Sequence, residues 1–541
     1  MQRLPGVDLQ RLGGDPAPGA PVQADRLHRV PRQPASPGEP PQHRQPVRVD
    51  GEADRRDHVA QRPGEQTGRG QPGQPRADRV TAGEEQPQGE ERERAERLEH
   101  RHLPGHPPLP DRWRLWIHPT SMPAALSARR GRTAGPVSTY YRGKRGYPGV
   151  DMSDAVIVGA VRTPVGRRKG SLAGVHPVDL SAHVLRALAE RTGIDPGLVD
   201  DVIWGCVSQV GEQSWNVARN AVLAAGWPES VPGTTLDRQC GSSQQALHFA
   251  AATVLSGQAD LVVAGGVESM TRVPMGSSVA GGMPFSAAIL ERYRGVEGVA
   301  ADSPLPFNQG VGAELIAQRW RFSRTQLDEF ALASHEKAAA AQDAGAFEAE
   351  LAPVALADGS KFSADEGIRR DTSLAKLGEL ATPFRADGVV TAGSASQISD
   401  GAAALAVTTA EWASRHGLRP LARVHTAVVA ADDPVTMLTA PIPATAKALR
   451  RAGLGIEEIG VYEVNEAFAP VPLAWLAETE ADPERLNPRG GAIALGHPLG
   501  GSGARIMTTM LQHMRDNGIR YGLQTMCEGG GMANATIVEL L

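Results

Sequence analysis

The pattern of apolar and polar positions changes sharply near residue 150. From Met152 onward, short continuous apolar runs alternate with stretches in which apolar residues recur at helical spacing. The apolar runs at 155–161, 199–205 and 261–266 predict buried strands, and the periodic stretches predict helices at 178–192, 216–225, 314–321 and 325–345. Strands that alternate with helices in this way are typical of an α/β fold.

One order of elements occurs twice. Cys240 lies in a turn before a helix of small and apolar residues, and a strand ending in Gly265-Gly266 follows. Later, a glycine-rich loop carrying His497 precedes a predicted helix at 501–517, and a strand at 521–526 leads to Cys527 and three glycines. This repetition predicts two similar halves that face each other.

The first 151 residues have a different composition. They contain no Phe, Trp or Tyr before Trp113 and no lysine before Lys144, and Arg, Pro, Gln, Gly and Glu dominate. Such a segment buries too little apolar surface to offset its chain entropy, so residues 1–151 are expected to form a disordered, low-complexity extension. We interpret it as an over-extended start of translation; a disordered interaction tail is the alternative. Its acidic runs argue against a transit peptide.

Charge and cysteine content exclude several classes of protein. The chain has 541 residues, 22% of them charged, and a net charge of −5, with no basic stripe for nucleic acid. Three cysteines are too few for a disulfide framework, and their spacing fits no metal site. No apolar run is long enough to cross a bilayer. We therefore expect a cytoplasmic protein without a metal and without nucleic-acid or membrane partners.

Cys240 is the first candidate for chemistry. Its place before a helix exposes it to unpaired N–H groups and the positive end of the helix dipole, which predicts a lowered thiol pKa. The alternative, for a cysteine considered alone, is a packed structural residue.

Four motifs taken together carry a family resemblance. Cys240-Gly-Ser-Ser, Asn465-Glu-Ala-Phe-Ala, Gly-His497-Pro and Cys527-Glu-Gly-Gly-Gly occur in this order, and residues 152–541 resemble the thiolase family. The resemblance implies a five-layered αβαβα fold of two duplicated halves, with an inserted loop domain and a homodimeric or homotetrameric assembly. The implied domains are an N-terminal half at 152–270 completed by about 398–420, a loop domain at 271–397, and a C-terminal half at 421–541.

The same resemblance assigns roles to five residues. Cys240 is similar to the family's acylated nucleophile, and His497 to the residue that activates it. Asn465 resembles the residue that holds a water for the first oxyanion site. Cys527 resembles the acid and base that protonates the acetyl-CoA enolate and then deprotonates CoA. The backbone N–H groups of Cys240 and Gly529 resemble the second oxyanion hole.

Coenzyme A is the expected co-substrate, with no tightly bound cofactor. Ser396 resembles a residue near the pantetheine, and Ala467 and Phe468 line the same tunnel by resemblance. Arg369 and Arg370 fall where the family places a phosphate-binding arginine, although the local spacing differs; a solvated pair of charges is the alternative.

The expected activity is CoA-dependent cleavage of 3-ketoacyl-CoA to acetyl-CoA and a shortened acyl-CoA, as in β-oxidation and lipid degradation. Asn308-Gln309-Gly310 stands where members that make acetoacetyl-CoA commonly carry His-Met-Gly, and this difference favours bulkier lipid or sterol-side-chain substrates. An acetoacetyl-CoA-forming acetyltransferase is the alternative, and a Cys–His hydrolase a remoter one. A ketoacyl-carrier-protein synthase would normally carry a second histidine at the place of Asn465, and a non-catalytic scaffold would not keep these residues together.

Overall fold

The computed structural model describes residues 151, 153–300, 303 and 306–541, so the expectation of a disordered extension falls, apart from Asp151, outside the described residues. The strands are β1 (Ala155–Arg162), β2 (Gly166–Arg167), β3 (Asp201–Gly205), β4 (Gly233–Leu236), β5 (Leu261–Ser269), β6 (Val354–Ala355), β7 (Lys361–Phe362), β8 (Ser399–Thr409), β9 (Ala422–Ala431), β10 (Val461–Val464), β11 (Tyr521–Glu528) and β12 (Met532–Leu540). The helices are α1 (Pro177–Thr192), α2 (Val217–Ala224), α3 (Ser242–Leu255), α4 (Ala287–Arg292), α5 (Gln309–Trp320), α6 (Arg324–Asp343), α7 (Leu374–Gly378), α8 (Ala410–Arg415), α9 (Pro441–Ala452), α10 (Pro470–Thr479), α11 (Ala492–Leu495) and α12 (Ser502–Asn517).

The helices and strands predicted from periodicity are present with changes at their ends, and the largest is at α5, which begins at Gln309 instead of the predicted 314. Helix α2 begins one residue later than expected because Asn216 is its N-cap, accepting the N–H of Arg219. Helix α6 begins after Ser323, whose hydroxyl accepts the N–H of Gln326 while the Gln326 side chain accepts the N–H of Ser323. This reciprocal capping box satisfies two donors that an uncapped helix leaves free.

Two groups of strands repeat one topology. Strands follow the order β4-β3-β5-β8-β1 in the first half and β9-β12-β11-β10 in the second, and a short contact between β1 and β9 joins them. β3 runs parallel to β5, which is antiparallel to β8, which is antiparallel to β1. β10, β11, β12 and β9 show the same succession of directions. The predicted duplication is therefore visible in the strand order.

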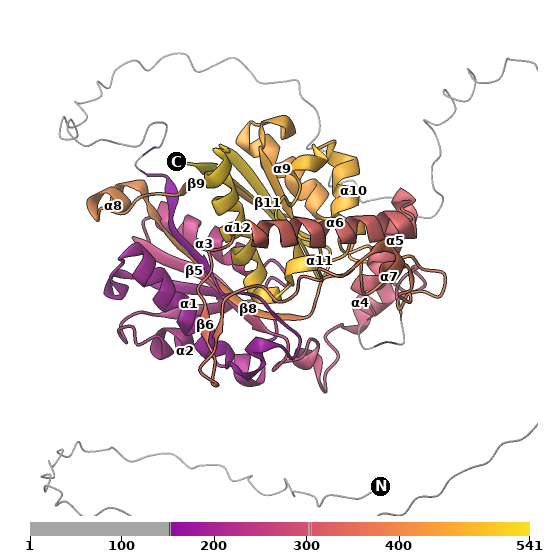
Figure 1. Cartoon of the computed structure of the whole chain (residues 1–541), viewed down its shortest axis with the longest axis horizontal. Helices are drawn as coiled ribbons and strands as arrows, with labels where there is room; N and C mark the ends of the chain where they lie inside the picture. Colours follow the sequence, from indigo (N-terminus) through magenta and orange to yellow (C-terminus); the bar gives the residue numbers. More distant parts are fainter. Residues whose placement is uncertain (1–150, 152, 301–302, 304–305) are drawn as a thin grey trace, which may run out of the picture. The chain divides into compact units, whose positions relative to one another are not determined.

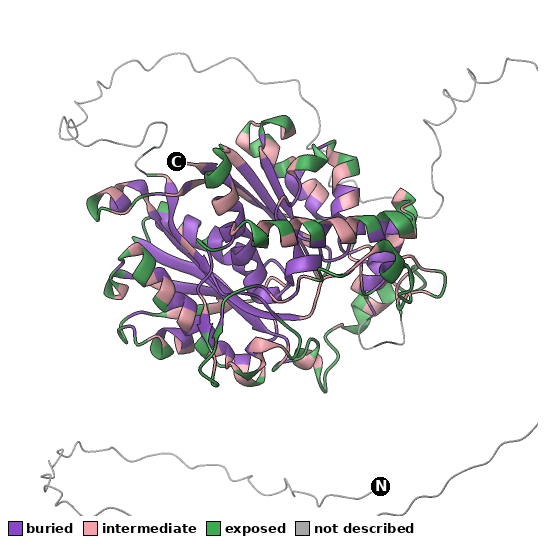
Figure 2. Ribbon diagram, viewed as in Figure 1, coloured by how far each residue is buried: buried purple, intermediate pink, exposed green. Residues whose placement is uncertain are grey.

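Helices α3 and α12 lie between the two groups of strands (Figure 1). Alternation along the strands produces this layering, because Ile157 on β1 packs with α3 and α12 while its neighbours Val156 and Val158 pack with α1 and α2. On the other half, α9 and α10 cover the outer face with an apolar cluster of their own. The helices between the strands are mostly buried (Figure 2), with exposed residues toward their C-terminal ends, and the five layers confirm the expected α/β fold.

The duplication allows the residues of the two halves to be aligned position by position. Helices α3 and α12 each begin at a serine nineteen positions before the strand that follows, Ser242 before Leu261 and Ser502 before Tyr521. In this register Glu268 near the end of β5 corresponds to Glu528 at the end of β11. The turn that contains Cys240 corresponds to the turn that contains Gly500.

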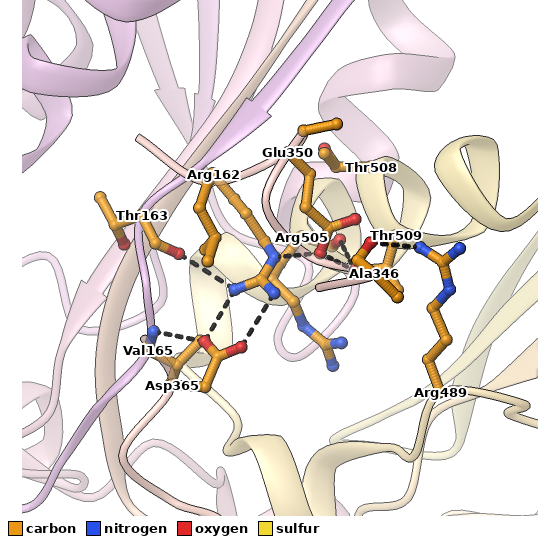
Figure 3. Close-up of polar contacts among 12 residues, drawn as sticks. Arg162, Thr163, Val165, Ala346, Glu350, Asp365, Arg489, Arg505, Thr508 and Thr509 are labelled. Atoms are coloured by element: carbon orange, nitrogen blue, oxygen red, sulfur yellow. Dashed lines mark hydrogen bonds and ion pairs between the residues drawn. The ribbon is translucent and has the colours of Figure 1, made fainter. Parts of the chain in front are cut away.

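A buried arginine attaches the segment between β5 and β8 to the core (Figure 3). Arg162 at the end of β1 donates from Nε to Glu350 at 2.6 Å, and from Nη1 and Nη2 to the two oxygens of Asp365 at 2.7 and 2.9 Å. Asp365 also accepts the N–H of Val165. Because all three charged side chains are buried, removing any one of them leaves an unpaired buried charge, which strongly destabilises a fold.

Candidate active site

The nucleophile candidate sits in a strained turn. Gln239, immediately before Cys240, has a φ of 48°, a left-handed conformation that non-glycine residues seldom adopt. The side chain of Asp237 accepts the N–H of Gln239 at 2.6 Å and so supports this conformation. Ser242 closes the turn, since its hydroxyl accepts from the N–H of Arg238 and donates to the carbonyl of Gln239. The turn places Cys240 two residues before the first residue of α3, as predicted.

The thiol of Cys240 is buried among apolar side chains. It belongs to a cluster with Met270, Leu499, Ile506 and Met526. Burial raises its pKa, and the acidic groups of Cys527 and Glu528 raise it further. The expectation of a lowered pKa was therefore wrong, because loss of hydration at this site outweighs the helix terminus. The resting thiol keeps its proton and needs a base to become nucleophilic.

His497 is held in one tautomer by Ser502. The Ser502 hydroxyl donates to the carbonyl of Pro498 at 2.9 Å, so its oxygen accepts from Nδ1–H of His497 at 2.7 Å. This assignment leaves Nε2 without a proton, and Nε2 lies 3.5 Å from the side-chain nitrogen of Asn465. Burial lowers the His497 pKa to about 3, and the charge of Arg505 contributes. The imidazole is therefore neutral at neutral pH and has a free basic nitrogen.

Arg505 is the cation whose charge helps to lower the pKa of His497. Its guanidinium is buried, and none of its three nitrogens has a hydrogen-bond partner in the described part of the chain. Figure 3 shows it beside the Arg162–Asp365 pair, on the same side as Arg489. Sequence reasoning missed both Ser502 and Arg505, because an i,i+5 serine and a helical arginine carry no motif.

Asn465 and Cys527 come from neighbouring parallel strands. β10 pairs with β11 up to Val464 and Thr525, and the N–H of Asn465 continues this pairing by donating to the carbonyl of Thr525 at 3.1 Å. Burial raises the pKa of Cys527 to about 12, and a hydrogen bond from the Asn465 side chain opposes this shift. Asn465 thus contacts both His497 and Cys527, and its side-chain oxygen is buried without a hydrogen-bond partner in the described residues.

The glycines after Cys527 approach the nucleophile turn. A Cβ at Gly529 would lie 2.9 Å from the side-chain oxygen of Gln239, so only a residue without a side chain fits there without displacement. Gly530 and Gly531 have φ values of 84° and 77°, which glycine adopts at little cost. The backbone of Gly529 therefore lies against the turn that carries Cys240.

Glu268 fixes the glycine-rich turn that follows His497. Its carboxylate accepts from the N–H groups of Val207, Ser208 and Gly500 at 2.9, 3.1 and 2.9 Å, and from the Gln213 side chain at 2.8 Å. The residue is fully buried, and burial raises the pKa of its carboxyl while these four donors oppose the shift by stabilising the carboxylate. No sequence motif indicates this role.

Candidate coenzyme-binding residues gather on one side of the site. Ser396 donates its N–H to the carbonyl of Ala467 at 2.9 Å, and Ala395 pairs with Phe468. The three residues that the family resemblance assigns to coenzyme A therefore lie together. A cavity of about 210 Å³ lies beside them, and Arg369 and Lys376 are among its lining residues. Arg369 has no ion-pair partner among the described residues.

Arg370 and Asn308 have local partners. Arg370 is exposed and pairs with Asp343 at 2.8 Å, and it does not line that cavity. The side chain of Asn308 caps α5 by accepting the N–H groups of Gly310 and Val311. The side chain of Gln309, the next residue, lies near enough to the Cys240 thiol to act on its pKa, opposing the rise that burial causes. Position 309 thus lies near the nucleophile, whereas position 308 serves the helix end.

Within the described ranges, no group of three or more His, Cys, Asp or Glu side chains is placed to hold a metal ion. In that same part of the chain, no helix is long and apolar enough to cross a membrane. All three cysteines carry free thiols.

A duplicated α/β scaffold with a buried cysteine, a neutral histidine and a second thiol defines an enzyme of the acyl-transfer class. Residues 155–411 match the model of the thiolase N-terminal domain, and residues 418–540 match that of the thiolase C-terminal domain. The chain belongs to the thiolase family and is an acyltransferase. The resemblance inferred from four motifs is confirmed.

Three relatives illustrate the similarity. The chain is 51% identical over 401 residues to the steroid 3-ketoacyl-CoA thiolase FadA6 of Mycobacterium tuberculosis, covering 73% of this chain and 96% of that protein. It is 44% identical over 398 residues to a 3-ketoacyl-CoA thiolase of Erwinia tasmaniensis, covering 72% and 100%. The crystal structure of the Bacillus anthracis acetyl-CoA acetyltransferase matches with a TM-score of 0.65 at 36% identity, covering 72% of this chain and 99% of that one.

Proposed function

We propose that the protein cleaves 3-ketoacyl-CoA with coenzyme A, giving acetyl-CoA and a shortened acyl-CoA, through an acyl-enzyme on Cys240. One observation carries the assignment: Asn465 contacts both His497 and Cys527, and Cys527 acts electrostatically on Cys240. The four residues come from separate turns and strands, and the fold brings them into one buried place. The names of two relatives, both 3-ketoacyl-CoA thiolases, support the same reaction.

In the first half-reaction, Nε2 of His497 accepts the thiol proton of Cys240. The sulfur then attacks the keto carbon of the substrate, and the bond between the keto carbon and its α carbon breaks. The electron pair of that bond forms the enolate of acetyl-CoA, which takes a proton from the Cys527 thiol. Acetyl-CoA leaves, and the shortened acyl group stays on Cys240 as a thioester.

In the second half-reaction, the Cys527 thiolate removes the proton from the thiol of incoming CoA. The CoA sulfur attacks the thioester carbon, Cys240 leaves, and acyl-CoA is released. The leaving Cys240 sulfur recovers its proton from His497, so both thiols return to their starting state. The raised pKa of Cys527 keeps its thiol protonated until the enolate forms and makes its thiolate a strong base toward CoA, and Asn465 stabilises that thiolate while it exists.

Two sites are proposed for the developing oxyanions. The side chains of Asn465 and His497 lie 3.5 Å apart from nitrogen to nitrogen, and we assign the first site to an oxygen that both side chains contact. The N–H groups of Cys240 and Gly529 form the second site, since Gly529 lies against the nucleophile turn.

Coenzyme A is proposed to enter along Ser396, Ala467 and Phe468. The phosphates are assigned to Arg369, with Lys376 beside it in the same cavity, while Arg370 is left to its pair with Asp343. No tightly bound cofactor takes part in these steps. The proposed location is the reducing cytoplasm, because free thiols persist there. The proposed assembly is a homodimer or homotetramer.

The substrate is proposed to be a medium or bulky 3-ketoacyl-CoA of lipid or sterol degradation. Each buried methylene adds roughly 0.8 kcal/mol, or about fourfold in affinity. Within Asn308-Gln309-Gly310, we assign contact with the substrate's acyl group to Gln309, because its side chain acts on the Cys240 thiol while Asn308 caps α5.

A panel of 3-ketoacyl-CoA substrates tests both parts of the proposal. Loss of the absorbance of the magnesium–enolate should require CoA, and kcat/KM should rise from acetoacetyl-CoA to longer chains. Substrate loss without CoA would identify a hydrolase instead. A clear preference for acetoacetyl-CoA would leave the thiolase reaction standing and overturn the substrate assignment.

A further inference from the structure

Two buried glutamates occupy equivalent places in the duplicated halves and have opposite surroundings. Glu268 on β5 contacts the turn of the second half at Gly500, through a direct hydrogen bond. Glu528 on β11 contacts the turn of the first half, because a Cβ at Gly241 would lie 2.1 Å from a Glu528 carboxyl oxygen. Each carboxyl therefore supports the turn of the opposite half.

Their hydrogen bonding differs. Glu268 accepts from four donors, whereas neither buried carboxyl oxygen of Glu528 makes a hydrogen bond of normal geometry in the described residues, and the one donor that acts on it is the backbone N–H of Asn534 on β12. A buried carboxylate with so few donors is costly, so a carboxyl kept in this state calls for a reason other than support of the turn.

The charges that face Glu528 come mainly from the nucleophile turn. Arg238 approaches to 4.0 Å from Nη1 to the carboxyl, which is too long for a hydrogen bond, and Asp237 adds a second negative charge. The remaining titratable neighbours are Cys240 in the turn and Cys527 on the same strand. On β12, the other strand packed against it, the neighbours Met532 and Asn534 do not titrate.

The geometry points to Glu528 as a positioning residue that shares one negative charge with the Cys240 thiolate. The carboxyl holds a proton when the thiolate forms, and it ionises only while Cys240 is a neutral thiol or thioester. This inference rests on the proposed role of Cys240 as nucleophile.

The mutual repulsion of the two acids provides the physical reason. Burial raises the pKa of Glu528 to about 8, so near pH 7 the carboxyl is mostly neutral and does not oppose the thiolate. Above that pH the ionised carboxyl raises the free energy of the Cys240 thiolate. No atoms are exchanged between the groups, since His497 takes the thiol proton; Glu528 only sets the field in which this happens.

The test measures the rate at which iodoacetamide alkylates Cys240, followed by peptide mass spectrometry between pH 6 and 10. In wild type, the logarithm of the rate should rise with pH, flatten above about pH 8 as Glu528 ionises, and then rise again. In Glu528→Gln the flat region should disappear, and the rate near pH 9 should increase about tenfold.

Glu463→Gln is the matched control. Glu463 is also a buried carboxyl with a pKa raised to about 8 by burial, but its charged neighbours are Arg505, Glu466, Arg489 and Glu350 rather than the nucleophile turn. This variant should keep the wild-type flat region. A purely structural role for Glu528 would lower the thermal unfolding temperature without moving the alkylation profile.

Each outcome separates this inference from the proposed function. A straight wild-type profile across pH 8, which needs no variant, would overturn the charge-sharing inference, as would an unchanged profile in Glu528→Gln. Both results leave Cys240 as the nucleophile if incubation with acyl-CoA still acylates it. If acyl-CoA modifies another residue, the proposed mechanism fails instead.

Discussion

The two turns that precede α3 and α12 occupy equivalent places in the two halves, but the buried glutamates beside them differ in their hydrogen bonding. Behind Gly500, Glu268 is saturated with donors and fixes the backbone that leads away from His497. Behind Cys240, Glu528 occupies the equivalent place but makes no hydrogen bond of normal geometry in the described residues. A glutamate thus anchors the backbone in one half, whereas its counterpart in the other half can change its charge. An unsatisfied group in one copy is easier to recognise as functional when its satisfied counterpart is present in the same chain.

The largest expected effect separates the two catalytic thiols. Cys240→Ala should lower thiolysis by about three orders of magnitude or more and should form no acyl-enzyme. Cys527→Ala should lose turnover similarly, because no group shuttles the proton, yet it should still accept an acyl group on Cys240. Intact-mass spectrometry after incubation with acyl-CoA distinguishes the variants, and an acyl group found on Cys527 would reverse the assignment.

The next effect compares the two glutamates by stability. Glu268→Gln turns an amide N–H₂ toward groups that are themselves donors, so it should cost about 2–4 kcal/mol of unfolding free energy. Glu528→Gln replaces a carboxyl that is mostly neutral near pH 7 and should cost no more than about 1 kcal/mol. Urea denaturation at pH 7 measures both. Equal losses would mean that the two carboxyls do the same structural work.

A further effect is the dependence of stability on pH. The pKa of Glu528 is raised from 4.5 to about 8 in the folded chain, so between these values the folded state holds a proton that the unfolded state has lost. Its neutral carboxyl therefore contributes stability that is fully present below about pH 4.5 and is lost as the pH rises toward 8. Glu528→Gln should weaken this decline, leaving a similar contribution from Glu463. A denaturation series from pH 5 to 8.5 checks the difference, and identical slopes would contradict it.

The sequence predicted the helices and strands well because apolar periodicity reports directly on which face is buried. It also predicted that Cys240 precedes a helix, and four ordered motifs identified the thiolase family. It failed on the Cys240 pKa, because burial depends on Met270, Leu499 and other side chains that are distant in the chain.

Residues that act through others were the hardest to predict. Ser502 is recognisable only once its hydrogen bond to His497 is seen, and Glu268 only once Gly500 lies beside it. Asn308 drew attention because it differs from the family pattern, but its side chain caps a helix while Gln309 lies near the nucleophile. Contacts between distant segments, rather than local pattern, decide such roles.

The position of β1 in the sheet has a consequence for the making of the protein. This apolar strand pairs with β8 along most of its length and with the start of β9, and the first of these partners is synthesised about 240 residues later. Ribosomes add roughly 5–20 residues per second, so the strand waits on the order of ten to fifty seconds for its partner. During that interval Ala-Val-Ile-Val-Gly-Ala-Val is an uncharged, β-prone segment of the kind that aggregates when exposed. Newly made chains therefore depend on protection of this strand, by chaperones or by early packing against α1, until β8 emerges.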